Sequence, residues 1–243
     1  MQPSVIRTGR PKAGPVSAAR LSSVRLPEID PLAAPWPLTT EVVDGRGLGV
    51  RRTPPTAPDR PPALYVHGLG GSATNWTDLA ALLAGRLDAE AVDLPGFGAS
   101  DPAADGDYSP RAHAAVLVKF LEQRGRGPVH LLGNSLGGVV SVLVAADRPD
   151  LVRTLTLISP AMPDLRPRRG PAPLLSAFAV PGVRQLANRY VDRIGTEARV
   201  RGVIEACFAD PTLIPAPRLV ETIAEAKQHE LLPWASKAFA DSV

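Results

Sequence analysis

The stretch that decides the fold is VHLLGNSLGG, residues 129–138. Its first half has the composition of a buried strand, and GNSLG, residues 133–137, matches the G-x-S-x-G pattern. Between a strand and a helix, this pattern places its serine on a sharp, strained turn with the hydroxyl exposed at the edge of a sheet. The neighbouring backbone then comes so close that Gly133 and Gly137 must stay small. We therefore take Ser135 as a candidate nucleophile.

The composition of the 243 residues is that of a globular protein. Hydrophobic residues make up 44% of the chain, and the net charge is only +3, although the isoelectric point is about 9.3. The arginines are scattered along the chain, so we expect no nucleic-acid partner. No apolar run reaches the roughly 18 residues that a membrane span needs, and the N-terminus lacks the apolar core of a signal peptide. We therefore expect a cytoplasmic protein that does not bind a membrane.

The cysteine and the histidines give no sign of a metal site. Cys207 is the only cysteine, which excludes an internal disulfide and a thiolate metal cluster. It lies in an apolar stretch, so we expect a buried free thiol. The histidines are isolated, and no pair is spaced for one helix face. The sequence thus predicts neither a metal nor a cofactor.

The N-terminal half alternates between strand and helix patterns. Residues 1–37 are rich in Pro, Ala, Arg and Ser, and we expect an irregular leader. An edge hairpin is predicted at 39–43 and 48–53. The elements expected after it are a strand at 63–66, a helix at 75–87, a strand at 90–93, a helix at 110–124, a strand at 129–132, a helix at 136–147 and a strand at 152–158. This alternation of apolar strands with helices favours a mostly parallel sheet with helices on both faces.

After Ser159 the pattern becomes helical only. The expected helices are at 174–180, 183–191, 196–209 and 218–240. We therefore divide the chain into the leader at 1–37, an α/β core at 38–163 and a helical region at 164–243.

Three motifs follow strands of the predicted sheet, at the edge where such sheets bind ligands. They are HGLGG at 67–71, DLPGFGAS at 93–100 and the serine turn at 133–137. In this order the motifs resemble those of the α/β-hydrolase superfamily, in its branch with a helical cap, from about Thr39 to the end of the chain. The resemblance implies an α/β core, here C-terminally incomplete, with the helical region as an all-helical cap.

The resemblance also implies roles for individual residues. Ser135 would attack a carbonyl carbon, and the backbone N–H groups of Leu69 and Leu136 would form the oxyanion hole. One such donor is worth about 3 kcal/mol in the transition state. His67 precedes the serine, whereas this fold orders its triad Ser, acid, His. We therefore expect His67 to orient the oxyanion loop and Asp93 to organise its own turn.

The catalytic acid and base are not evident in the sequence. His229 is the only histidine after Ser135, and its helical surroundings predict a solvated helix residue. Asp164, in a Pro/Arg-rich loop, is a conceivable acid. In the resembling family the acid and the histidine follow later strands, so we expect this chain to be a fragment that is nearly inactive by itself.

The expected function is serine-dependent hydrolysis of a carbonyl compound. A carboxylic ester, or a diketone cleaved at a carbon–carbon bond, would fit, and a small, largely apolar substrate is expected. A serine at the turn argues against haloalkane dehalogenases and epoxide hydrolases, which use a carboxylate there. An acyltransferase and a non-catalytic ligand-binding protein are the alternatives, and the oligomeric state stays open.

Overall fold

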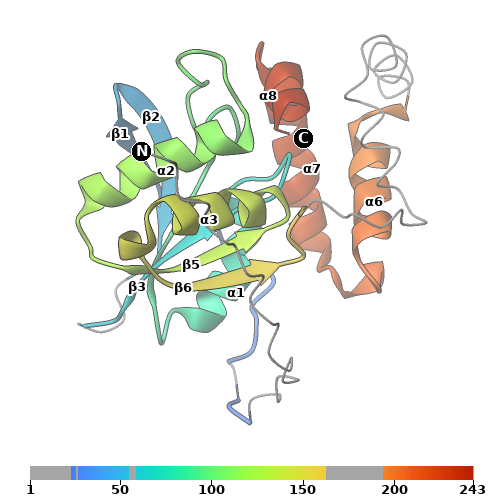
Figure 1. The fold of residues 1–243 in the computed structure, drawn as a ribbon. Helices are drawn as coiled ribbons and strands as arrows, with labels where there is room; N and C mark the ends of the chain where they lie inside the picture. The colour runs from blue at the N-terminus through green and yellow to red at the C-terminus, as the bar shows by residue number, and fades with distance from the viewer. Residues whose placement is uncertain (1–22, 26, 55–58, 163–193, 243) are drawn as a thin grey trace, which may run out of the picture.

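The computed structural model describes residues 23–25, 27–54, 59–162 and 194–242, which form a six-stranded sheet with helices around it (Figure 1). The strands run in the order β1-β2-β4-β3-β5-β6. Their bounds are β1 Leu38–Val43, β2 Arg46–Arg52, β3 Pro62–Val66, β4 Asp88–Val92, β5 Val129–Asn134 and β6 Val152–Ile158. The first two strands form the predicted edge hairpin and pair antiparallel, and β2 also pairs antiparallel with β4. The other neighbours are parallel, which confirms the predicted mostly parallel sheet.

Helices cover both faces of the sheet. The helical elements are η1 Ala73–Trp76, α1 Thr77–Leu83, α2 Pro110–Arg124, α3 Leu136–Asp147, η2 Pro149–Leu151, α6 Thr196–Cys207, η3 Pro211–Leu213, α7 Ala216–Glu230 and α8 Ala235–Asp241. On one face α2 and α3 pack on Leu64 and Val66 of β3. On the other face η1 and α1 pack on Ala63 and Tyr65 of the same strand. Neighbouring residues of β3 therefore serve two separate cores, as a strand buried on both faces requires.

Local signals set the ends of α2 as predicted. The Ser109 side chain accepts a hydrogen bond from the Ala112 N–H, Pro110 is the first helical residue, and Gly125 ends the helix at a φ of 58°. The helix predicted at 75–87 is shorter than expected, since it divides into η1 and α1 and ends at Leu83.

The prediction of a single helix at 218–240 is wrong, because the segment forms two helices, α7 and α8. Pro233 lies between α7 and α8 and has no N–H to donate to the preceding turn. The N–H of Leu232 bonds instead to the carbonyl of His229, three residues back. The chain can therefore turn, and α8 packs separately from α7.

The segment that contains Cys207 also differs from expectation. Helix α6 lies against α7 on the outside of the molecule (Figure 1), and none of its residues is buried. Cys207 is exposed, so the expected buried thiol is wrong. The apolar stretch around Cys207 correctly indicates that α6 packs on another element. It does not show that α7 covers too little of α6 to bury any residue. The helices predicted at 174–180 and 183–191 lie outside the described residues, as does Asp164.

The edge strand β6 is open to solvent. Among the described strands it pairs with β5 alone, and from Arg153 to Ile158 every residue is exposed. None of the helices in the described part of the chain has both the length and the apolar character that a membrane crossing requires.

Candidate active site

Ser135 occupies the turn between β5 and α3 in a strained backbone conformation. Its φ is 50° and its ψ is −115°, a region that residues with a side chain rarely adopt. The end of β6 and the residues just after it bind both the N–H and the carbonyl of Ser135. The Ser135 N–H donates to the carbonyl of Ile158 at 3.1 Å, and the Ser135 carbonyl accepts from the N–H of Ala161 at 3.0 Å. The backbone at Ser135 is therefore fixed by tertiary hydrogen bonds.

The glycines around Ser135 stand where a side chain has no room. A Cβ on Gly133 would lie 2.3 Å from the carbonyl oxygen of Gly137. A Cβ on Gly137 would lie 2.3 Å from the carbonyl oxygen of Val66, at the end of β3. The expectation that both positions must be very small is confirmed.

The loop after β3 runs directly beside Ser135. A Cβ on Gly68 would lie 3.3 Å from the Cβ of Ser135, so the loop leaves no room for a further side chain beside the serine. Leu69 is the next residue of the loop. On the other side Leu136 is the first residue of α3, and the N–H groups of a first helical turn have no partner within the helix. The two predicted oxyanion donors thus belong to the two segments that flank the serine.

His67 orients this loop through both of its ring nitrogens. Its side chain is fully buried, and Nε2 accepts a hydrogen bond from the Leu94 N–H at 2.9 Å. Nδ1 therefore carries the proton and donates it to the carbonyl of Gly68 at 2.7 Å. Burial lowers the pKa of His67, although the nearby Asp93 opposes this. Neither nitrogen is available as a base, and the predicted orienting role agrees with these bonds.

Asp93, directly after β4, ties its own loop at 93–100 to the start of η1. Its carboxylate is buried and accepts from the N–H of Ala73 at 2.6 Å and from the N–H of Ala99 at 2.9 Å. The Ser100 hydroxyl donates to the Asp93 carbonyl at 2.7 Å. Both carboxylate oxygens are thus engaged by backbone, and Asp93 organises its turn as expected.

His229 is not the solvated helix residue that its sequence surroundings predict. The side chain is half-buried, and its Nε2 lies 3.0 Å from the carbonyl of Gly96. The ring stacks on Phe97, with 5.3 Å between ring centroids and 5° between ring planes. The expectation was wrong because α7 packs on the loop after β4, a contact between segments far apart in the sequence. Within the described residues, no side chain forms a hydrogen bond with the Ser135 hydroxyl.

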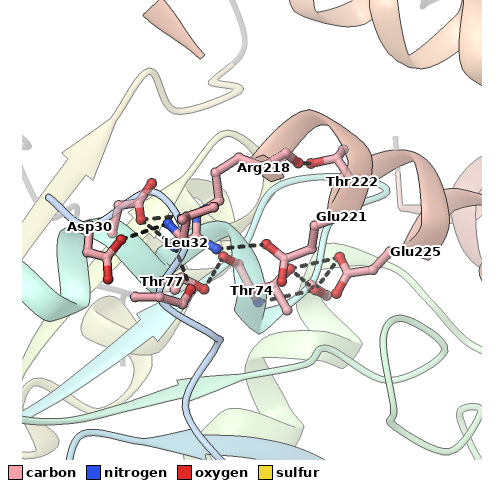
Figure 2. Close-up of polar contacts among 11 residues, drawn as sticks. Asp30, Leu32, Thr74, Thr77, Arg218, Glu221, Thr222 and Glu225 are labelled. Atoms are coloured by element: carbon pink, nitrogen blue, oxygen red, sulfur yellow. Dashed lines mark hydrogen bonds and ion pairs between the residues drawn. The ribbon is translucent and has the colours of Figure 1, made fainter. Parts of the chain in front are cut away.

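Two polar contacts hold α7 beside the candidate site (Figure 2). The Arg218 guanidinium donates twice to Asp78 of α1, at 2.8 and 3.0 Å, and once to the carbonyl of Ala33. About two turns further along α7, a Glu225 carboxylate oxygen accepts hydrogen bonds from the hydroxyls of Thr74 at 2.7 Å and Ser72 at 3.0 Å. Burial raises the pKa of Glu225, and the two hydroxyls oppose the rise.

These contacts connect the helix to the segment that follows the 67–71 loop. The side chain of Ser72 also caps η1, directly after that loop. Sequence reasoning missed the whole set, because a polar side chain on a helix gives no sign of the hydroxyl or carboxylate that it will meet.

Comparison with known proteins agrees with this geometry. A family model described as alpha/beta hydrolase fold matches residues 61–194. The chain is 38% identical over 98 residues to Esterase Rv0045c of Mycobacterium tuberculosis, which is 40% of this chain and 32% of that protein. It is 35% identical over 97 residues to the dihydrolipoyllysine-residue acetyltransferase component of the acetoin cleaving system of Cupriavidus necator, which is 40% of this chain and 26% of that protein.

Among solved structures, the chain is similar to that of Cfl2 from Burkholderia cenocepacia. The TM-score is 0.72 at 20% sequence identity, and the match covers 88% of this chain and 73% of the other. This likeness concerns the fold alone. The chain matches about a third or less of the length of the two curated relatives named above.

Proposed function

Because the chain belongs to the α/β-hydrolase fold family, we propose that it is a serine hydrolase of a carboxylic ester or related carbonyl compound, with Ser135 as its nucleophile. The observation that carries the proposal is the backbone of Ser135, whose φ of 50° is held by the end of β6. Strain of this kind at a non-glycine residue concentrates at functional sites. A relative that is an esterase supports the choice of an ester.

The proposed chemistry begins with attack of the Ser135 hydroxyl oxygen on the substrate carbonyl carbon. The carbonyl oxygen becomes an oxyanion, which the backbone N–H groups of Leu69 and Leu136 stabilise. The intermediate then expels the alcohol and leaves an acyl-serine, and water releases the acid in a second, similar step. Removing one of the two donors would cost about 3 kcal/mol of transition-state stabilisation.

The proton of the Ser135 hydroxyl needs an acceptor, and we place that acceptor outside the described residues. His67 uses both ring nitrogens in backbone hydrogen bonds, and His229 directs its Nε2 at the Gly96 carbonyl. A positioned general base contributes roughly 10²–10⁴ in rate. Turnover of p-nitrophenyl esters by the 243-residue chain is therefore expected to be low.

Covalent labelling tests the nucleophile without requiring turnover. The chain is incubated for hours with excess fluorophosphonate, and the modified peptide is identified by mass spectrometry. We expect the label on Ser135 and its loss in Ser135→Ala. Ser236→Ala, which removes an exposed serine of α8, serves as a matched control and should label like the parent. Labelling that persists in Ser135→Ala, or a parent that takes no label, would contradict the proposal.

A further inference from the structure

Helix α8 brings an aromatic side chain onto the loop beside Ser135. A Cβ on Gly70, whose φ is 71°, would lie 3.3 Å from Cε2 and 3.6 Å from Cδ2 of Phe239. The ring therefore lies against the backbone of Gly70, the residue that follows the proposed oxyanion donor Leu69. The Phe239 side chain is nevertheless 38% exposed. One part of the ring is fixed on the loop, and another part stays free to contact a ligand.

The position of Phe239 is set by neighbouring residues of the same helix. Ala238 is fully buried, and its Cβ lies 3.1 Å from the place that a Cβ on Gly96 would take. At the end of α8 the buried Ser242 hydroxyl lies 2.9 Å from the Tyr108 carbonyl and 3.0 Å from Nε2 of His113. The helix is thus attached on both sides of Phe239, which fixes the backbone from which the ring projects.

The loop geometry connects Phe239 with the serine. A side chain on Gly68 would meet Ser135, and a side chain on Gly70 would meet Phe239. Gly68 and Gly70 are two residues apart, so their Cα atoms are separated by at most about 7 Å. An acyl group that starts at Ser135, with its oxygen on the Leu69 N–H, would reach the Phe239 ring if its chain runs along this stretch of backbone.

We infer that Phe239 forms an apolar wall of the acyl-binding pocket and limits the length of the acyl chain that the site accepts. The inference rests on the proposed function, because it takes the acyl group to begin at Ser135. The substrate class that follows is an ester of a short-chain apolar acid. A longer chain would meet the ring, because the contacts of α8 keep the backbone of Phe239 beside the loop.

The test is a binding series that needs no chemistry at Ser135. Saturated primary carboxamides of increasing chain length are titrated into the chain by calorimetry. Each buried methylene contributes about 0.8 kcal/mol, so affinity should rise about fourfold per carbon until the chain reaches the ring, and then level off. In Phe239→Ala the rise should continue for at least two more carbons, so the longest amides should bind more than tenfold tighter than they bind the parent.

Two further variants complete the experiment. Phe208→Ala removes a phenylalanine that is 50% exposed and directly follows α6, and it should leave the series unchanged. Phe239→Leu keeps an apolar contact on Gly70 and should give an intermediate chain-length limit, which covers the case that Phe239→Ala does not fold. The same limit in the parent and in the folded Phe239 variants would overturn the inference, as would a parent that binds no amide. If the chain-length limit shifts in the Phe239 variants but fluorophosphonate does not label Ser135, the proposed chemistry is refuted. The contact of Phe239 with the bound chain would still be supported.

Discussion

A methyl group added at Gly137 tests the packing that places Ser135 beside the 67–71 loop. The new Cβ would lie 2.3 Å from the carbonyl oxygen of Val66 and 2.5 Å from that of His67. Real Cβ atoms essentially never come within 3.0 Å of another heavy atom. Both obstacles are backbone atoms at the end of β3, so no side-chain rotation can relieve the contact. Either α3 or the loop must move.

The magnitude follows from two opposing effects. Overpacking costs typically about 1–3 kcal/mol, and a backbone obstacle belongs at the upper end of that range. Replacing glycine by alanine inside a helix returns about 1 kcal/mol. We therefore expect Gly137→Ala to lower the free energy of unfolding by about 2 kcal/mol. For a chain of this length that corresponds to a Tm lower by about 4–8 °C.

Gly202→Ala is the matched control. Gly202 lies in α6, and nothing is within 4 Å of its would-be Cβ, so only the helix-propensity gain of up to about 1 kcal/mol remains. The assay is urea unfolding of parent and variants, compared by midpoint at constant m value. If Gly137→Ala were as stable as Gly202→Ala, the close approach of α3 to β3 would be wrong. Ser135 would then not lie beside the 67–71 loop as described.

Two further predictions concern buried polar groups. Burial lowers the pKa of His113 to about 4. The unfolded chain, in which this histidine has its ordinary pKa of 6.5, therefore takes up the proton first as the pH falls. The folded chain keeps its full stability above pH 6.5 and loses this contribution as the pH falls from 6.5 towards 4. The stability lost over this range amounts to about 3 kcal/mol. His113→Gln should therefore flatten the corresponding part of the pH dependence of the urea midpoint between about pH 7 and 4.5. An unchanged slope would contradict the burial of a neutral His113. Arg218→Ala should lower the free energy of unfolding by about 1–3 kcal/mol, because it leaves Asp78 and the Ala33 carbonyl without their partner. Arg201→Ala, which breaks an exposed pair with Glu197, should change it by less than about 0.5 kcal/mol, and equal effects of the two variants would count against the α7 contact.

The sequence was sufficient for the parts of the fold whose signals are local. The central strand β3 is a short apolar run, and α2 carries its own start and stop residues in Ser109, Pro110 and Gly125. The three motifs at 67–71, 93–100 and 133–137 correctly indicated the α/β-hydrolase family, because each fixes a tight backbone turn through small residues.

The helical segment could not be predicted in the same way. Pro233 indicates a break, but the prediction extended the helical spacing of Leu219, Ile223 and Ala226 across it to residue 240. The stacking of His229 on Phe97 and the contact of Phe239 with Gly70 join residues more than 130 positions apart. No local pattern encodes such partners, since either side chain would suit an exposed helix equally well. Phe239, which we propose to limit the acyl chain, is therefore a residue that sequence reasoning missed.

The strain at Ser135 links the candidate nucleophile to the open edge of the sheet. A residue with a side chain at positive φ costs about 1–3 kcal/mol and persists only where its surroundings fix it. The last residue of β6, Ile158, accepts from the Ser135 N–H and from the Asn134 side chain, and Ala161, just after the strand, donates to the Ser135 carbonyl. Yet β6 pairs only with β5 among the described strands, and its own residues from Arg153 onward are exposed. The end of this strand therefore helps to hold Ser135 in its strained conformation, while the strand itself is paired on one side only among the described strands. Whatever pairs with the outer side of β6 would also stabilise the geometry of Ser135, without touching the serine itself.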